Sequence, residues 1–122
     1  MLNVRRFEGC TAVVTGGSGG IGSAVCQGLA AEGATVIVLD VTQGPVDALV
    51  TQLRKDGHTA DGHVVDVRDA AAVSQLMSSV HEAHGGPHLV VTLAGGSLGT
   101  PKDLAEIASD HLYLVVDVNV KG

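Results

Sequence analysis

The sequence predicts an α/β fold in which helices cover both faces of a parallel sheet. Short apolar, β-prone runs alternate along the chain with segments whose apolar residues repeat at helical spacing. This alternation is typical of βαβ units. Aromatic residues number only two, Phe7 and Tyr113, so the core must be built from Val, Leu, Ile and Ala, which suit strands buried on both faces. A length of 122 residues accommodates one such domain.

Charge and hydropathy exclude several classes of protein. The formal net charge is −6, with basic residues scattered along the chain, which gives no electrostatic basis for binding nucleic acid or an anionic membrane. No apolar run approaches the ~20 residues of a membrane span. Arg5 and Arg6 are followed by no apolar segment before the first strand, so we expect no signal peptide and a cytoplasmic protein. Cys10 and Cys26 are then expected to be thiols rather than a disulfide.

A glycine-rich stretch at residues 15–22 is the most informative part of the chain. It follows an apolar run at residues 10–14, a predicted strand, and precedes a predicted helix. The apolar face of that helix consists of Ala24, Val25, Leu29 and Ala30. A strand, a glycine turn and a helix start form a site for phosphate groups, because glycines allow close approach and the first-turn amides face the anion. A glycine-rich surface loop is the alternative, but it would need neither flanking element.

The second predicted strand, at residues 35–39, ends on an acidic residue, Asp40. A carboxylate at this place can accept hydrogen bonds from both hydroxyls of an adenosine ribose. Asp40 follows Gly16 by 24 positions (40 − 16), close to the ~20 expected for a dinucleotide-binding acid. It would repel a 2′-phosphate, and no Arg or Lys is near it in sequence, which favours NAD over NADP. A solvent-facing Asp at a strand end is the alternative.

The remaining elements continue the same alternation. We expect a second helix that contains Pro45 in its first turn and ends at Gly57, and a third strand at residues 63–67. A third helix follows, capped by Asp69, with an inner face of Val73, Leu76, Met77 and Val80. The fourth strand is predicted at residues 88–93. Residues 109–120 are predicted to be helical because Ser109 and Asp110 resemble a helix start, although their Val content would also fit a strand.

Five separated motifs resemble those of the short-chain dehydrogenase/reductase family. Residues 15–22 fit the family's glycine pattern T-G-x-x-x-G-I-G, and Asp40 resembles the acid that binds the ribose in that family. Asp66-Val67 resembles the pair that contacts the adenine ring, and Ala94-Gly95 resembles the end of the family's Asn-Asn-Ala-Gly motif. Asn119 resembles the family's catalytic asparagine. The resemblance implies a Rossmann-type three-layer sandwich with a partial sheet of about four strands in the order 3-2-1-4. It also implies NAD as cofactor, with NADP less favoured, and Asn119 as a catalytic residue. The implied cofactor-binding residues are Gly16, Ser18, Gly20, Ile21, Gly22, Asp40, Asp66, Val67, Ala94 and Gly95.

The sequence departs from the family pattern in two ways. Thr92 and Leu93 stand where the family usually has two asparagines. The resemblance implies that the family's catalytic Ser, and its Tyr and Lys four residues apart, would lie in a half that follows Gly122. The only tyrosine, Tyr113, is followed four residues later by Asp117 and not by Lys, so we do not expect it to be the family's acid. We therefore expect residues 1–122 to be the cofactor-binding half of an oxidoreductase, truncated after the fourth helix.

The resemblance implies hydride transfer between nicotinamide and a small alcohol or ketone in a homo-oligomeric enzyme. Residues 1–122 alone are expected to be inactive. A non-catalytic nucleotide-binding module is the alternative.

Three other sites fit the sequence less well. His81 and His84 are spaced by three, not by the four of H-E-x-x-H, so no metal site is expected. The glycine run is not followed by Gly-Lys-Ser/Thr, which excludes a P-loop. An S-adenosylmethionine methyltransferase usually has an acidic residue just before its glycines. This chain has Val14 and Thr15 there, which disfavours that class of enzyme.

Overall fold

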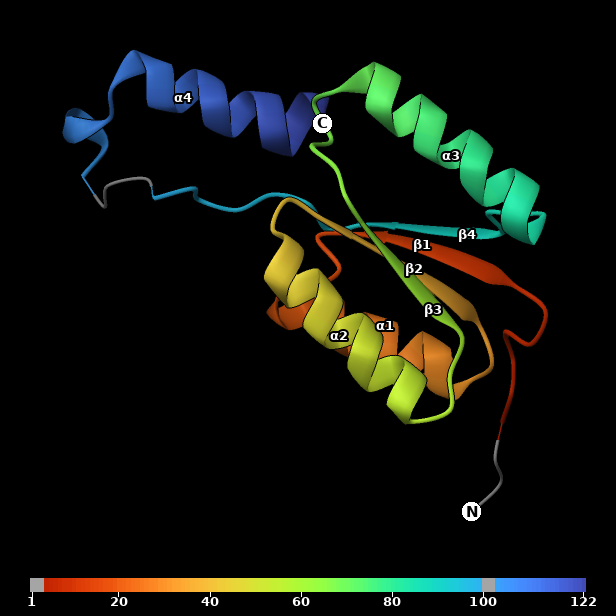
Figure 1. Cartoon of the computed structure of the whole chain (residues 1–122). Coiled ribbons are helices and arrows are strands. Elements are labelled where there is room, and N and C mark those ends of the chain that lie inside the picture. Colours follow the sequence, from red (N-terminus) through yellow and green to blue (C-terminus); the bar gives the residue numbers. More distant parts are fainter. Residues whose placement is uncertain (1–3, 100–102) are drawn as a thin grey trace.

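The computed structural model describes residues 4–99 and 103–122, which form one parallel sheet with helices on both faces (Figure 1). The first half contains β1 (Thr11–Thr15), α1 (Gly20–Ala31), β2 (Thr35–Asp40) and α2 (Gln43–Lys55). The second half contains β3 (Ala60–Val64), α3 (Ala70–His84), β4 (Leu89–Thr92), a 3₁₀ turn (Leu104–Glu106) and α4 (Ser109–Val116). A π-helical turn, Asp117–Lys121, continues α4. The predicted alternation of strands and helices is therefore confirmed.

The sheet has the strand order β3-β2-β1-β4, and every pair is parallel. The predicted order 3-2-1-4 is confirmed. Because all strands run the same way, their carboxyl ends meet at one edge of the sheet. The order reverses beside β1, so the loops that follow β1 and β4 diverge there and leave room for a ligand.

Residues of the two central strands alternate between two cores. Val14 and Val38 belong to the core beneath α1 and α2, whereas Val13 and Ile37 belong to the core beneath α3. This follows from the two-residue period of a strand, which points successive side chains to opposite faces. All four are fully buried, so both strands carry helices on each face, as Figure 1 shows for α1 and α2 on one side and α3 on the other.

The predicted helix signals agree with the structure at several points. The Asp69 side chain caps α3 by accepting a hydrogen bond of 3.0 Å from the backbone N–H of Ala72. The predicted inner face of α3, which consists of Val73, Leu76, Met77 and Val80, packs in the second core. The helical interpretation of residues 109–120 is also confirmed, with α4 beginning at Ser109. In α1, by contrast, Ala24 is exposed and Cys26 lies in the buried face instead.

The predicted third strand was wrong by three residues, because β3 is formed by Ala60–Val64 and not by residues 63–67. Its pairing with β2 fixes this position, placing Ala60 beside Val36. Gly62 reduces the β-propensity of the segment, yet packing requires it. A Cβ at Gly62 would lie 2.5 Å from Val46 Cγ1 and 2.8 Å from Val50 Cγ2, because α2 crosses β3 closely there.

Candidate functional site

The loop between β1 and α1 is shaped by glycines that have no room for a side chain. Gly16 has φ +64°, and a Cβ on it would lie 2.6 Å from the carbonyl oxygen of Leu93. A Cβ on Gly22 would overlap the carbonyl oxygen of Gly16 and lie 2.8 Å from Gly17 Cα. The loop is therefore folded tightly against β4 and against its own helix, in a way that only glycine permits.

Helix α1 begins inside this loop with an open amino end. Its N-cap, Gly19, supplies no side-chain hydrogen bond, and its first turn has no acidic residue. A Cβ on Gly20 would meet nothing within 4 Å, so space is open in front of that residue. First-turn amides lack intrahelical partners and carry the positive end of the helix dipole. The start of α1 is thus suited to an anionic group such as a pyrophosphate.

Asp40 lies at the end of β2, where the glycine loop holds its carboxylate. Oδ2 accepts hydrogen bonds from Ser18 Oγ at 2.6 Å and from the Ser18 backbone N–H at 3.2 Å. Oδ1 accepts one of 2.8 Å from the backbone N–H of Val41. Since each carboxylate oxygen has two lone pairs, Asp40 keeps acceptor capacity for a ligand.

Asp66 follows β3 and is held by Arg68, two residues further along. The Asp66 carboxylate accepts from the Arg68 backbone N–H at 2.9 Å and from Arg68 Nη2 at 2.6 Å, and Arg68 Nε lies 3.0 and 3.1 Å from its two oxygens. These side-chain and backbone hydrogen bonds lower the pKa of Asp66 to about 2. The carboxylate is therefore ionised at neutral pH and accepts hydrogen bonds only.

The segment after β4 is tied to both β1 and α4. Thr15 Oγ1 accepts hydrogen bonds from the backbone N–H groups of Leu93 (3.1 Å) and Ala94 (3.2 Å). Asn119 accepts a 2.8 Å hydrogen bond from the Gly96 N–H and donates to the Gly96 carbonyl at 2.9 Å. The hydroxyl of Thr15 therefore links the end of β4 to β1.

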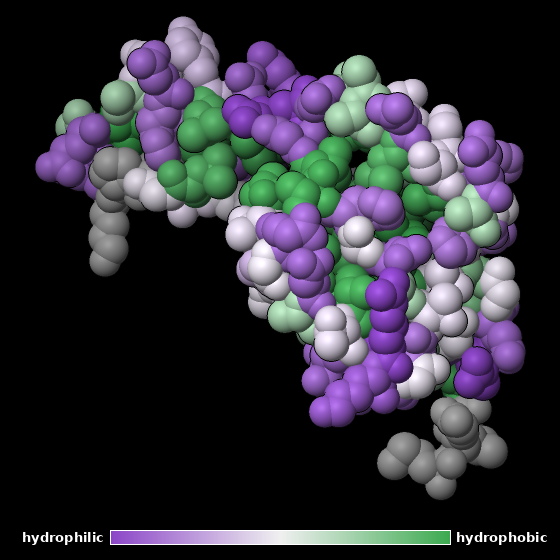
Figure 2. All heavy atoms as spheres, in the orientation of Figure 1, coloured by the Kyte–Doolittle hydropathy of each residue, from purple (hydrophilic) through white to green (hydrophobic). Residues whose placement is uncertain are grey.

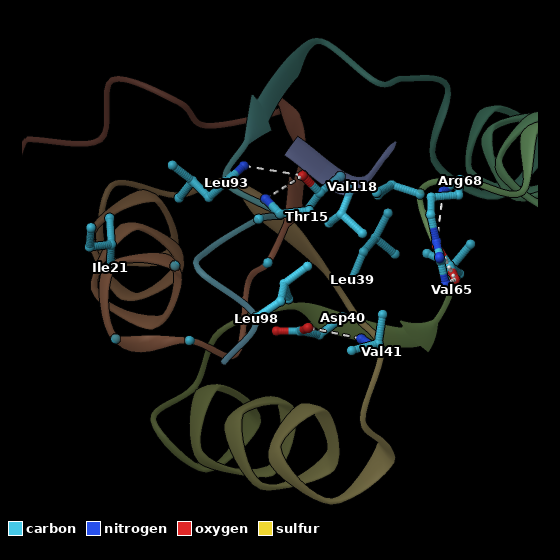
Figure 3. A pocket seen from close by; sticks show the side chains of 18 of the residues that line it. Thr15, Ile21, Leu39, Asp40, Val41, Val65, Arg68, Leu93, Leu98 and Val118 are labelled. Carbon is cyan, nitrogen blue, oxygen red and sulfur yellow. Dashed lines mark hydrogen bonds and ion pairs between the residues drawn. The ribbon is translucent and has the colours of Figure 1, made fainter. Parts of the chain in front are cut away.

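These strand ends surround an open cleft of about 770 Å³ (Figure 3). In Figure 3, Ile21 projects from α1, Asp40 lies between the glycine loop and Val41, and Arg68 lies beyond the end of β3. Nine of the ten predicted cofactor-binding residues line the cleft: Gly16, Gly20, Ile21, Gly22, Asp40, Asp66, Val67, Ala94 and Gly95. Ser18 lies beside the cleft through its hydrogen bond to Asp40. The Asn119 side chain lies against Gly95, which lines the cleft, and hydrogen-bonds the neighbouring Gly96, so the structure brings the predicted set together.

The sequence patterns did not indicate the apolar wall of the cleft or the Arg68 side chain at its end. Leu98, Leu114 and Val118 line the wall, and Arg68 lies at the far end. Hydrophobic residues gather where α4 faces the rest of the molecule (Figure 2). Leu114 and Val118 are four residues apart on one helix face, a spacing that could have indicated them.

Other chemistries find little support in the described part of the chain. No group of three or more His, Cys, Asp or Glu residues there could hold a metal ion. Cys26 is buried below the glycine loop, and burial raises the pKa of its thiol to about 11, so it is not a thiolate nucleophile at neutral pH. Over residues 4–99 and 103–122, no helix has the length and apolar character needed to cross a membrane.

The chain matches the family model described as short chain dehydrogenase over residues 10–122. The 2,3-dihydro-2,3-dihydroxybenzoate dehydrogenase of Bacillus subtilis (strain 168) is 32% identical over 94 residues, which cover 77% of this chain and 36% of that protein.

Solved structures show the same relationship. A citronellol catabolism dehydrogenase of Pseudomonas aeruginosa PAO1 superposes with a TM-score of 0.88 at 29% identity, over 98% of this chain and 48% of that one. An NAD⁺-bound xylitol dehydrogenase also gives a TM-score of 0.88, at 28% identity, over 95% of this chain and 44% of that one. The protein therefore belongs to the short-chain dehydrogenase family, and its chain spans less than half the length of these relatives.

Proposed function

We propose that this chain is the cofactor-binding half of an NAD-dependent oxidoreductase that acts on an alcohol or ketone. The carrying observation is the Asp40 carboxylate, held at the end of β2 by Ser18 beside an open helix start. When bound, the nicotinamide ring of NAD would accept or supply the hydride. The residues of this chain would bind and orient the dinucleotide.

The order of groups along NAD fits the order of strand ends. Neighbouring strands are about 4.8 Å apart, so the ends of β1, β2 and β3 form a row. A pyrophosphate at the start of α1 would place the adenosine ribose at Asp40 and the adenine base at Asp66 and Val67. The other half of the dinucleotide would lie on the opposite side of β1, along Ala94 and Gly95. The glycines at positions 16 and 22 leave the backbone approach that this arrangement needs.

NAD is favoured over NADP because no unpaired cation faces Asp40. Arg68 is the only Lys or Arg lining the cleft in the part of the chain that the structure describes, and it is already engaged with Asp66. A 2′-phosphate at Asp40 would meet a carboxylate without a compensating positive partner. The NAD⁺-bound state of the related xylitol dehydrogenase supports this choice.

Asn119 is proposed to act in catalysis, as its family counterpart does. In this chain its side chain bonds to Gly96 and to the Val115 carbonyl, so it fixes the loop after β4. Tyr113 does not provide the acid of the reaction, because Asp117 rather than Lys stands four residues on. A positioned acid or base typically contributes ~10²–10⁴-fold in rate. We therefore propose that the 122-residue chain alone binds cofactor without turnover, as a non-catalytic module would.

Titration of the isotope-labelled chain with NAD, followed by amide NMR, tests the proposal. Saturable binding should shift amides at residues 16–22, 40–41, 66–68 and 94–96, and leave those of the solvent face of α2 unchanged. Addition of simple secondary alcohols to the NAD complex should produce no NADH absorbance. Absence of saturable NAD binding, or perturbations confined to another surface, would refute the proposed function.

A further inference from the structure

The segment that follows Ala94 runs along the cleft before the chain reaches α4. We name this segment, residues 95–99, the strap. Two of its residues line the cleft, Gly95 at its base and Leu98 near its far end. Figure 3 shows the Leu98 side chain pointing into the cleft, in this view between Ile21 of α1 and Leu39 of β2. Leu98 therefore fills part of the space in front of the strand ends.

Leu98 has a backbone conformation that leucine rarely adopts. Its φ is +51°, and it is the one non-glycine residue with a positive φ among residues 4–99 and 103–122. This left-handed conformation brings Cβ too close to the following carbonyl oxygen, so it costs backbone energy. The residue is 41% exposed, so more than half of its surface is covered. Burial of this apolar surface offsets the strain and holds the strap in place.

Glycines and two anchoring side chains determine how the strap can move. Gly96 and Gly99 have φ of +138° and +80°, conformations that glycine adopts without steric cost. Asn119 holds the base of the strap through hydrogen bonds of 2.8 and 2.9 Å to Gly96. His111 Nε2, on α4, lies 3.3 Å from the carbonyl oxygen of Ser97. The far end of the strap can therefore swing about its glycines while its base stays attached to the helical segment after it.

We propose that the strap is an autoinhibitory segment, in which Leu98 occupies the cofactor cleft of the free chain and is displaced by the dinucleotide. The proposal rests on the proposed function, which places the pyrophosphate at the start of α1 and the adenosine ribose at Asp40. Both groups need hydrogen bonds from the cleft, and the isobutyl group of leucine offers none. Displacement exposes the Leu98 side chain but releases its backbone strain, so the bound dinucleotide shifts the strap to its open form.

A closed strap lowers the apparent affinity for NAD. The measured dissociation constant is the intrinsic one divided by the fraction of molecules whose strap is open. Removal of the apolar contact raises that fraction. Leu98→Ala should therefore bind NAD about 3- to 10-fold more tightly than the native chain, the gain expected when burial of roughly half a leucine side chain no longer stabilises the closed form.

Calorimetric titration of the native chain and Leu98→Ala with NAD measures this change. Leu112→Ala is the matched control, because Leu112 is a leucine of similar exposure, 53%, on α4 and outside the lining of the cleft. It should leave the affinity unchanged. Equal or weaker binding by Leu98→Ala would overturn the inference, since Leu98 would then be a fixed wall that the bound dinucleotide contacts.

NMR of methyl-labelled leucine and valine observes the strap directly. In the free chain, NOEs should connect the Leu98 methyl groups to other side chains that line the cleft, such as Leu39 and Val41. These NOEs should disappear at saturating NAD. Their persistence in the NAD complex, or their absence from the free chain, would also overturn the inference.

The outcomes separate this inference from the proposed function. If neither the native chain nor Leu98→Ala binds NAD, the proposed function fails and the inference falls with it. If both bind NAD but Leu98→Ala gains no affinity, the proposed function stands and only the inference fails.

Discussion

Ser18 Oγ donates a 2.6 Å hydrogen bond to Asp40 Oδ2, joining the glycine loop after β1 to the acid at the end of β2. The backbone N–H of Ser18 donates to the same oxygen at 3.2 Å. The two residues are 22 positions apart in sequence. Asp40 is thus oriented toward the cleft before any ligand binds, so little conformational freedom remains to be lost on binding.

Ser18→Ala should weaken NAD binding without unfolding the chain. The change removes one charge-assisted hydrogen bond and leaves the backbone contact, so we expect a loss of ~1–2 kcal/mol, or about 5- to 30-fold in affinity. Calorimetric titration with NAD measures it. Ser79→Ala is the control, because the Ser79 hydroxyl donates to the Gln75 carbonyl within α3. Equal affinity in the native chain and Ser18→Ala would show that the hydroxyl does not orient Asp40.

Gly22→Ala should destabilise the fold and abolish NAD binding. Its new Cβ would overlap the Gly16 carbonyl, and overpacking of this kind typically costs ~1–3 kcal/mol. Gly28→Ala is a matched control in the same helix, because a Cβ there meets nothing within 4 Å. It should stabilise the chain by ~0.5–1 kcal/mol through the better helix propensity of alanine. Chemical denaturation of both variants, with NAD titration, checks this prediction, and a Gly22→Ala chain that binds NAD normally would contradict it.

Asn119→Ala should loosen the loop after β4. Asn119 makes hydrogen bonds of 2.8 and 2.9 Å to Gly96 and one of 2.9 Å to the Val115 carbonyl. Their loss should reduce the free energy of unfolding by ~1–2 kcal/mol, given their exposure. Amide exchange at Gly96 should be faster in Asn119→Ala than in the native chain. Asn119→Asp keeps only the acceptor oxygen, so its exchange rate at Gly96 should lie between those of the native chain and Asn119→Ala. Unchanged exchange at Gly96 in Asn119→Ala would argue against the loop-fixing role.

The β1–α1–β2 unit could be predicted because its signals are local. The glycines, the helix face and Asp40 follow one another within about thirty residues, and each motif carries its own physical reason. The Asp69 cap was predictable for the same reason, since capping acts across three residues.

Features that depend on packing across the chain could not be predicted. The bounds of β3 depend on pairing with β2 and on the close approach of α2 at Gly62. The hydrogen bond from the Leu93 N–H to Thr15 Oγ1 joins residues that are 78 positions apart in sequence, so no local pattern predicts it. The placement of Arg68 in the cleft depends likewise on how β3 ends.

The outer edge of β4 should make the 122-residue chain self-associate. Within the described residues β4 pairs only with β1, and Val90 is 52% exposed on it. An edge strand without Lys or Pro invites pairing with another chain. Val90→Lys should shift the sedimentation profile toward monomer. Val64→Lys, on the opposite edge, should not, because β3 already contains the charged residue Asp61, which disfavours edge pairing. A native chain that sediments as a stable monomer, with residues 89–92 strongly protected from amide exchange, would contradict this prediction.

The most direct test of the central claim is a paired calorimetric titration of NAD and NADP. The native chain should bind NAD more tightly by ~1.5–3 kcal/mol, about 10- to 150-fold, because Asp40 gains ribose hydrogen bonds from NAD and repels a 2′-phosphate. Asp40→Ala should narrow this gap, while Asp47→Ala, at an exposed position on α2, should leave it unchanged. Equal or tighter binding of NADP by the native chain would contradict the account.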